Sequence, residues 1–164
     1  MLSDLTRFPR LPFATTLLVG LGLVVGGVLM TEFMRLAACP LCIIQRMLYL
    51  LLALLAALGM PLARTAARRL VAAAMAAAAG VGVFVAGYQV WIQRFAPETG
   101  CSGKMTWWEE FVDWAGQQVP ILFQADGLCA DPGWKLLGLS IAEWSFACFV
   151  GLLLLALYTL LRKR

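Results

Sequence analysis

Four cysteines and one arginine are the residues whose types and spacing suggest chemistry. Cys39 and Cys42 form a Cys-Pro-Leu-Cys motif, and Cys101 and Cys129 follow later with 27 residues between them. Arg46 lies four positions after Cys42, so in a helix the two side chains share one face. A helix N-terminus and a guanidinium both favour the thiolate form of a cysteine. This pattern predicts a redox-active pair at Cys39 and Cys42.

Two other interpretations of the four cysteines are open. A structural zinc site could use all four, because paired ligands at this short spacing are common in such sites. The wide second spacing and the absence of histidine argue against zinc, and we expect no metal site. Two static disulfides are the other possibility, although a Cys-x-x-Cys ring is so short that it adds little stability. Thiol–disulfide exchange is favoured because vicinal thiols close and reopen a disulfide rapidly.

Arg46 also indicates what could accept the electrons. An arginine near the end of a membrane helix is costly, and it either snorkels to the headgroups or serves a function. Its guanidinium could hold a carbonyl oxygen that becomes anionic on reduction, as in a quinone. Gln45 could supply a further hydrogen bond. A quinone beside Cys42 would couple dithiol oxidation to electron transport in the membrane.

Long hydrophobic runs are the elements that must position these residues. The chain of 164 residues is 62% hydrophobic and 13% charged, and this charged share is about half that of a soluble domain. Four runs approach or exceed the roughly 20 residues that cross a bilayer. They are residues 12–30, 43–60, 70–92 and 141–161. The sequence predicts an all-α membrane protein whose four transmembrane helices form a bundle.

The basic residues predict the orientation of this bundle. Eight of the thirteen lysines and arginines, with the single acid Asp4, lie in three segments that share one side if each run spans once. By the positive-inside rule that side is cytoplasmic. It comprises residues 1–11, 61–69 and 162–164, and the outer loops are 31–42 and 93–140. The net charge of +4 therefore reflects topology, and we expect no nucleic-acid partner.

Residues 106–119 of the long loop predict a short amphipathic helix. Thr106 and Glu109 fit a capping box. The large aromatic side chains share one face: Trp107, Phe111 and Trp114. Such a helix can lie in the bilayer interface, with its tryptophans at headgroup depth.

Small residues within the runs have a simpler interpretation. Gly22 and Gly26 are spaced as in helices that approach closely in lipid, so we expect them to pack the bundle. Cys148, inside the last run, is expected to be a small apolar packing residue.

These features together resemble the DsbB family of bacterial inner-membrane disulfide bond formation proteins. The segment CPLCIIQR, residues 39–46, fits the family pattern Cys-x-x-Cys-x-x-[Glu/Gln]-Arg. The segment VPILFQADGLCADPGWKLLGLSIAEW, residues 119–144, is also similar in order. With four spans and one cysteine pair in a long second outer loop, the resemblance covers nearly the whole chain.

The resemblance implies a role for each site residue. Cys101 and Cys129 would form the loop disulfide that oxidises a DsbA-like thioredoxin-fold partner, with Cys101 as the mixed-disulfide site. Cys39 and Cys42 would reoxidise that pair through a transient Cys39–Cys129 bond. Cys42 would then pass the electrons to ubiquinone or menaquinone, with Arg46 at the quinone.

The resemblance also implies a location and shows one departure. It places the chain in the bacterial inner membrane, in contact with lipid, with both termini cytoplasmic and the active loops periplasmic. Some members carry a histidine near the outer end of the third helix. Here Val90 and Trp91 lie in that region, and Arg94 is a substitute candidate.

Two alternative functions follow from the same residues. A vitamin K epoxide reductase-like thiol oxidase also joins a Cys-x-x-Cys to a quinone, but there the active motif is expected late in the chain. The other alternative function is that of a non-catalytic membrane metal-binding or scaffold module.

Pro40, between the two cysteines, should alter the strain and the reduction potential of the Cys39–Cys42 pair.

Overall fold

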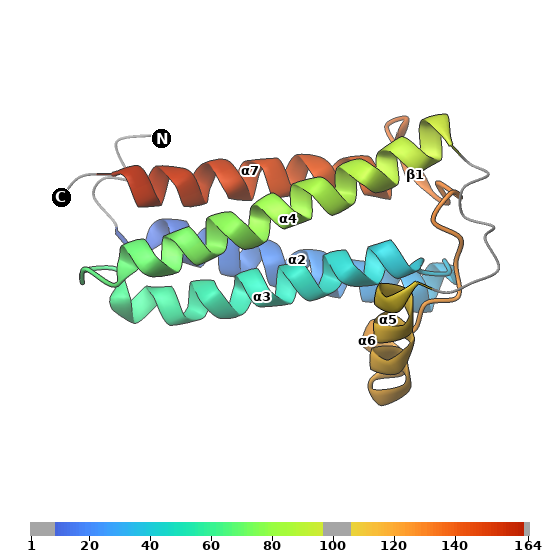
Figure 1. Ribbon diagram of the computed structural model, residues 1–164, viewed down its shortest axis with the longest axis horizontal. Coiled ribbons are helices and arrows are strands. Elements are labelled where there is room, and N and C mark those ends of the chain that lie inside the picture. Colours follow the sequence, from blue (N-terminus) through green and yellow to red (C-terminus); the bar gives the residue numbers. More distant parts are fainter. Residues whose placement is uncertain (1–8, 97–105, 163–164) are drawn as a thin grey trace.

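Four long helices dominate the molecule. The computed structural model describes residues 9–96 and 106–162, and within these ranges four helices are long and apolar enough to cross a membrane. They are α2 (Leu11–Met34), α3 (Pro40–Leu62), α4 (Arg68–Phe95) and α7 (Ile141–Leu161), and they lie alongside one another as a bundle (Figure 1). The predicted all-α membrane fold is confirmed.

The connection between α2 and α3 is shorter than the predicted loop 31–42. Helix α2 continues to Met34 and ends at Arg35, whose backbone is left-handed with φ of 51°. Helix α3 begins at Pro40 rather than at residue 43, and Cys39 is its N-cap. Proline suits the first helical position, because its fixed φ fits the helix and its missing N–H would have no helical partner there. Pro40 therefore starts the helix that carries the reactive pair.

Three of the four neighbouring helix pairs in the bundle pack closely, and the fourth pair does not. Helix α3 packs along α2 and α4, and α4 packs along α7, whereas α2 and α7 make little contact. Between α3 and α7, the Tyr49 and Phe149 rings stack with 4.1 Å between centroids. Gly82 of α4 admits this arrangement, because a Cβ at that position would overlap the Phe149 ring. An opening is left between α2 and α7.

The remaining elements cover one end of the bundle. Helix α5 (Trp107–Gln118) runs crosswise to the long helices, and the short α6 (Pro120–Phe123) follows it (Figure 1). Strands β1 (Lys135–Leu136) and β2 (Leu139–Ser140) form an antiparallel pair in which Leu136 pairs with Leu139. Gly138, with φ of 81°, lies in the turn between them, where a left-handed backbone favours glycine.

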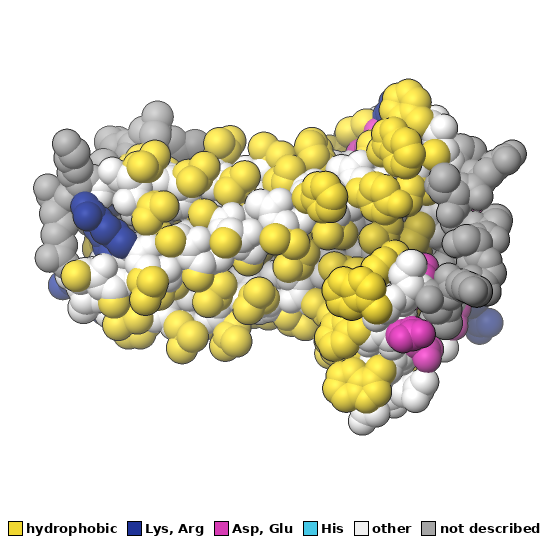
Figure 2. All heavy atoms as spheres, viewed as in Figure 1, with side chains coloured by type: hydrophobic (Ala, Val, Ile, Leu, Met, Phe, Trp, Pro, Cys, Tyr) yellow, Lys and Arg dark blue, Asp and Glu magenta, His cyan; other side chains and the backbone are white. Residues whose placement is uncertain are grey.

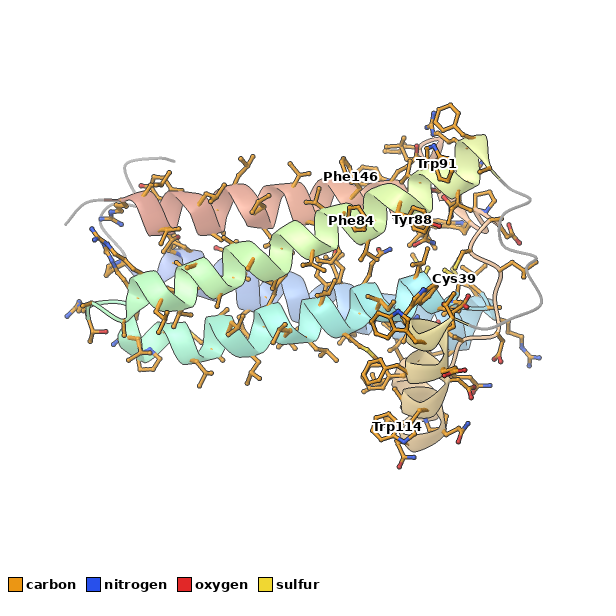
Figure 3. All side chains as sticks on the ribbon, viewed as in Figure 1. Cys39, Phe84, Tyr88, Trp91, Trp114 and Phe146 are labelled. Atoms are coloured by element: carbon orange, nitrogen blue, oxygen red, sulfur yellow. The ribbon has the colours of Figure 1, made fainter. Side chains whose placement is uncertain are left out.

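The amphipathic helix predicted in the long loop is confirmed as α5. The Glu109 carboxylate accepts a hydrogen bond of 2.7 Å from the Thr106 backbone N–H, as in a capping box. Its aromatic face is exposed: Trp107, Phe111 and Trp114. Figure 2 shows hydrophobic side chains on α5 next to those of the long helices, and Figure 3 shows Trp114 near one end of α5.

Candidate active site

Cys39 and Cys42 meet at the start of α3. Their sulfurs are 3.0 Å apart, and the Cys42 backbone N–H donates to the Cys39 sulfur at 3.3 Å. Cys39 therefore caps the helix with its own thiol. Figure 3 shows Cys39 at the end of the bundle where α5 crosses it. The two thiols are in direct contact, as a pair that exchanges between dithiol and disulfide requires.

Cys129 is brought to this pair by a backbone contact between the two loops. The Gly127 N–H donates to the Ala38 carbonyl oxygen at 2.9 Å. A Cβ on Gly127 would overlap the Ala37 carbonyl, so only glycine allows this approach. Cys129 then packs against the buried Cys39. The structure thus brings together the two cysteines that the resemblance joins in a transient bond.

The contact between Cys39 and Cys129 shifts the pKa values of the two thiols in opposite directions. The hydrogen bond from Cys39 lowers the pKa of Cys129, a second from the Leu41 backbone N–H lowers it further, and burial opposes both. The same hydrogen bond, together with one to Cys42 and burial, raises the pKa of Cys39 well above its usual value. Of these two thiols in the reduced protein, Cys129 is therefore the one that ionises more readily, and the thiolate is the reactive form.

Replacing Cys39 with alanine is expected to raise the pH at which Cys129 becomes reactive. In the wild type the lowered pKa means that Cys129 is already partly thiolate below the range of an ordinary thiol. Loss of the Cys39 donor removes the main cause of that shift, so the alkylation profile moves to higher pH. Peptide-resolved mass spectrometry of the reduced protein, alkylated across a pH series, measures this midpoint. Cys42→Ala is the control, since it keeps the Cys39–Cys129 contact, and an unmoved midpoint in Cys39→Ala would contradict the assignment.

Gln89 of α4 is a site residue that the sequence reasoning missed. Its Nε2 donates to the Cys39 sulfur at 3.2 Å and to the Cys42 sulfur at 3.1 Å. Gln45 of α3 donates from its Nε2 to the Gln89 Oε1 at 2.6 Å. A signal was present, because Gln89 is a polar residue inside an apolar run, and such residues usually mark functional sites. Gln45, which was expected to hydrogen-bond a quinone, donates one amide N–H to Gln89 and also lines the cavity described below.

Arg46 points into the protein and does not snorkel to the headgroups. It is 9% exposed. Its Nη2 donates to the Gly27 carbonyl oxygen at 2.8 Å and to the Thr31 hydroxyl at 2.7 Å, both on α2. Its Nη1 donates to the Leu122 carbonyl oxygen of α6 at 3.1 Å. The guanidinium thus joins α2, α3 and α6 beside the cysteine pair.

A cavity of about 370 Å³ lies next to these residues. It is lined by parts of α2, α3, α7, the α2–α3 connection and the segment around β1, and Cys42, Gln45 and Arg46 all line it. Most of its other lining residues are apolar, as in a site for a small organic ligand. The cavity therefore offers an apolar chamber with a thiol, an amide and a cation at one end.

The glycines of α2 contribute to this cavity, contrary to the packing role expected for them. Gly22 and Gly26 line it, and a Cβ on either would meet no described atom within 4 Å. Gly20 has the expected role, since a Cβ there would lie 2.9 Å from the Tyr49 carbonyl oxygen. Cys148 packs against the core as expected and also lines the cavity.

Comparisons with known proteins agree on one family. The sequence model described as "Disulfide bond formation protein DsbB" matches residues 9–159. The chain is 43% identical over 155 residues to disulfide bond formation protein B of Dechloromonas aromatica (strain RCB), covering 92% of each. It is 38% identical over 157 residues to the protein of that name from Verminephrobacter eiseniae (strain EF01-2), covering 92% of this chain and 86% of the relative. The chain belongs to the DsbB family. It is accordingly a multi-pass membrane oxidoreductase of disulfide bond formation.

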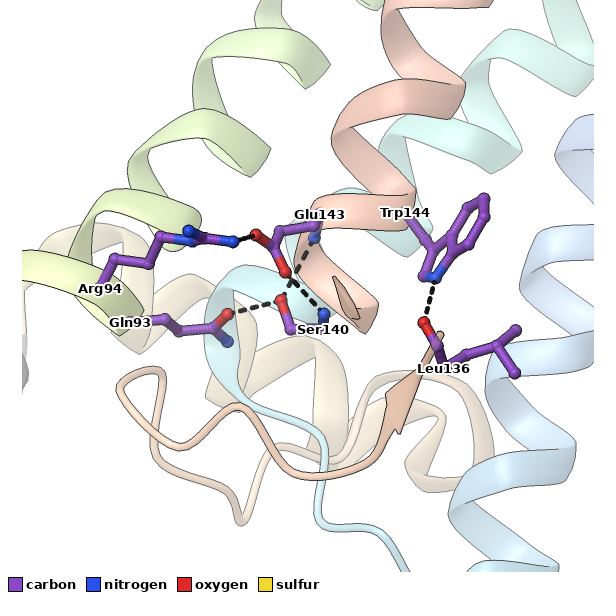
Figure 4. A network of polar contacts seen from close by, with 6 residues as sticks. All are labelled: Gln93, Arg94, Leu136, Ser140, Glu143 and Trp144. Carbon is purple, nitrogen blue, oxygen red and sulfur yellow. Dashed lines mark hydrogen bonds and ion pairs between the residues drawn. The ribbon is translucent and has the colours of Figure 1, made fainter. Parts of the chain in front are cut away.

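Within this DsbB family member, Arg94 has a different role from the one considered for it. It pairs with Glu143 at the start of α7 (Figure 4). Glu143 also accepts from the Ser140 backbone N–H at 2.7 Å, and the Ser140 hydroxyl donates to Gln93 at 2.8 Å. Trp144 completes the network by donating to the Leu136 carbonyl oxygen at 3.1 Å. Arg94 is not among the described residues that line the cavity, and it holds the end of α4 to the start of α7.

The remaining predicted site residue is Cys101, which lies outside the described residues. Within residues 9–96 and 106–162, no group of three or more histidine, cysteine, aspartate or glutamate side chains could hold a metal ion. The described part of the site thus consists of Cys39, Cys42 and Cys129 with Gln45, Gln89 and Arg46.

Proposed function

We propose that this protein reoxidises a DsbA-like thioredoxin-fold partner and passes the electrons to ubiquinone or menaquinone. The observation that carries the proposal is the position of Cys42, which contacts Cys39 on one side and lines the apolar cavity on the other. A dithiol at a cavity wall can exchange with thiols outside and with a lipid-soluble oxidant inside. Membership of the DsbB family favours this over the vitamin K epoxide reductase-like alternative.

The thiol steps combine the roles that the resemblance implies with the contacts of Cys39 to Cys42 and Cys129, which support them. The partner dithiol reduces the Cys101–Cys129 disulfide and leaves as a disulfide. The Cys129 thiolate then attacks Cys39 of the Cys39–Cys42 disulfide, so that a Cys39–Cys129 bond forms and Cys42 leaves as a thiolate. Cys101 attacks Cys129 in turn, which restores the loop disulfide and releases Cys39. Two electrons now reside on the Cys39–Cys42 dithiol.

The surroundings of Cys42 suit a leaving thiolate. The Gln89 amide N–H donates to its sulfur, Cys42 lies in the first turn of α3 at the positive end of the helix dipole, and Arg46 lies one helical turn further along. A bound quinone would accept two electrons and two protons as the Cys39–Cys42 disulfide re-forms. Arg46 would orient its oxygen and stabilise negative charge there.

The cavity fits a quinone in both chemistry and position. Its volume of about 370 Å³ lies within the range for small-ligand pockets, and Cys42, Gln45 and Arg46 are among the few polar groups that line it. Helices α2 and α7, which form two of its walls, make little contact with each other. A long apolar tail could therefore leave between them into the lipid.

The charges support an orientation in the inner membrane with the cysteine end in the periplasm. Figure 2 shows acidic side chains only toward the end where α5 crosses the bundle, whereas Arg10, Arg64 and Arg69 lie in the chain segments at the opposite end. By the positive-inside rule the basic end is cytoplasmic. The exposed aromatic face of α5 would then lie at headgroup depth and hold the long loop against the membrane.

A reconstituted electron-transfer assay tests the proposed function. Purified protein in detergent is mixed with ubiquinone and a reduced DsbA-like partner, and quinone absorbance is followed with time. We expect one quinone to be reduced for each partner disulfide formed. An absorbance that does not change while the partner stays reduced would contradict the proposal. Repeating the assay with menaquinone shows which quinone is preferred.

Replacing Arg46 with methionine is expected to weaken quinone use selectively. The change keeps an apolar side chain but removes the cation at the cavity wall. Loss of one hydrogen bond to a charged group costs enough binding free energy to raise the KM for quinone about tenfold. The KM for the reduced partner should stay close to the wild-type value. Steady-state kinetics with each substrate varied separately measures both. A rise confined to the partner KM would remove Arg46 from the quinone site.

A further inference from the structure

We infer that Gln89, oriented by Gln45, sets the redox equilibrium of the Cys39–Cys42 pair by stabilising its reduced form. This deepens the proposed relay and rests on Cys39 and Cys42 exchanging between dithiol and disulfide. Gln89 touches the reacting sulfurs directly, and Gln45 acts through Gln89 as a positioning residue.

The burial of both amides shows that this contact is specific. Gln89 is 2% exposed and Gln45 is 4% exposed, each within a helix long and apolar enough to span the membrane. A buried amide is costly unless its hydrogen bonds are made. The Gln89 amide makes its hydrogen bonds to Gln45 through its oxygen and to the two cysteine sulfurs through its NH₂ group. The partners of the NH₂ group are therefore the atoms that undergo the redox reaction.

The direction of the effect follows from what each sulfur can accept. A thiolate accepts a hydrogen bond strongly, because bonds to charged groups are stronger than neutral ones. A disulfide sulfur carries no charge and gains less from the same donor. The Gln89 N–H therefore favours the dithiol over the disulfide and makes the pair more oxidising, since stabilising the reduced form raises the reduction potential.

Gln45 fixes which end of the Gln89 amide faces the sulfurs. An amide offers an oxygen acceptor on one side and an NH₂ donor on the other. Because Gln45 Nε2 donates to Gln89 Oε1 at 2.6 Å, that oxygen is held away from the cysteines and the NH₂ group is directed at them. Rotation of the Gln89 amide would place a lone pair against a thiolate, and Gln45 disfavours this arrangement.

The test measures the equilibrium of the pair with glutathione, without any quinone. Wild-type and variant proteins in detergent are equilibrated across a series of reduced to oxidised glutathione ratios, and the states of Cys39 and Cys42 are read by peptide-resolved thiol labelling. In Gln89→Met, which keeps the size but loses the donor, we expect the ratio of dithiol to disulfide to fall about tenfold. For a two-electron couple this is a potential about 30 mV more negative.

Two further variants separate this role from a purely structural one. Gln45→Met leaves the Gln89 donor in place but unoriented, so we expect a smaller fall in the same direction, about threefold. Gln93→Met makes the same chemical change one turn further along α4, where the side chain bonds Ser140 rather than a sulfur, and it should leave the equilibrium unchanged. Thermal unfolding identifies variants that lose the fold.

The outcomes are decisive. A folded Gln89→Met with a wild-type equilibrium overturns the inference, as does an equal shift in Gln93→Met. If Gln89→Met does not fold, the Gln45→Met shift decides in its place, and no shift there overturns the inference. Because the assay contains no quinone and no protein partner, a failure of quinone reduction in the wild type would refute the proposed function and leave this result standing.

Discussion

Replacing Cys42 with serine is expected to abolish quinone reduction. Serine has nearly the same size, but its oxygen can neither form a disulfide with Cys39 nor deliver the electrons that a thiolate delivers. Because the Cys42 sulfur both contacts Cys39 and lines the cavity, no other described side chain can replace it in both contacts. We expect a loss of at least about a thousandfold in the rate of quinone reduction by the reduced partner, as for removal of a reacting nucleophile. Quinone absorbance measures the rate.

A second measurement on Cys42→Ser shows whether the rest of the relay is intact. The contact between Cys39 and Cys129 does not depend on the Cys42 sulfur. In the variant the free Cys39 can attack Cys129 of the Cys101–Cys129 disulfide and release Cys101 as a thiol, so a Cys39–Cys129 disulfide should accumulate, which peptide mapping under non-reducing conditions detects. Quinone reduction at the wild-type rate would remove Cys42 from the electron path. Absence of the Cys39–Cys129 disulfide would indicate that the two loops do not meet as the structure has them.

Replacing Gly26 with leucine is expected to block the cavity without disturbing the fold. Gly26 lines the cavity, and a Cβ there meets no described atom within 4 Å, so the new side chain extends into the space assigned to quinone. The quinone and the leucine side chain cannot occupy the same volume. The free-energy cost of such overpacking is large enough to raise the KM for quinone at least about tenfold. The KM for the reduced partner and the midpoint of thermal unfolding should change little.

Gly151→Leu is the matched control for this experiment. Gly151 is also a helical glycine at which a Cβ would meet nothing within 4 Å among the described atoms, but it is not one of the residues that line the cavity. It should leave both KM values unchanged. An equal rise in quinone KM for the two variants would point to a general effect of added bulk in lipid, and no rise for Gly26→Leu would place the quinone elsewhere.

Much of this architecture could be predicted because its causes are local in the sequence. The four spans follow from the length of the apolar runs, and the start of α5 follows from the Thr106 and Glu109 capping pair. The proximity of Cys42 and Arg46 follows from their spacing within one helix, and both line the cavity. In each case neighbouring residues in the chain determine the outcome.

What could not be predicted depends on how separate helices are rotated against one another. Gln89 lies 44 positions from Gln45, and only the packing of α4 on α3 directs both amides at the cysteine pair. The same holds for Gly22 and Gly26, whose spacing fits close packing equally well but which face open space beside α7. The short α2–α3 connection was missed because α2 extends past its apolar run as far as Met34.

The backbone bond from Gly127 to Ala38 has a kinetic consequence. It fixes Cys129 beside Cys39 within one folded chain, so the entropy of bringing these sulfurs together has already been lost on folding. In the proposed relay, exchange between the two cysteine pairs would then be a first-order event that does not depend on how much protein is present. The encounter with the proposed thioredoxin-fold partner would remain second-order, and at low abundance of that partner it would limit the overall flux.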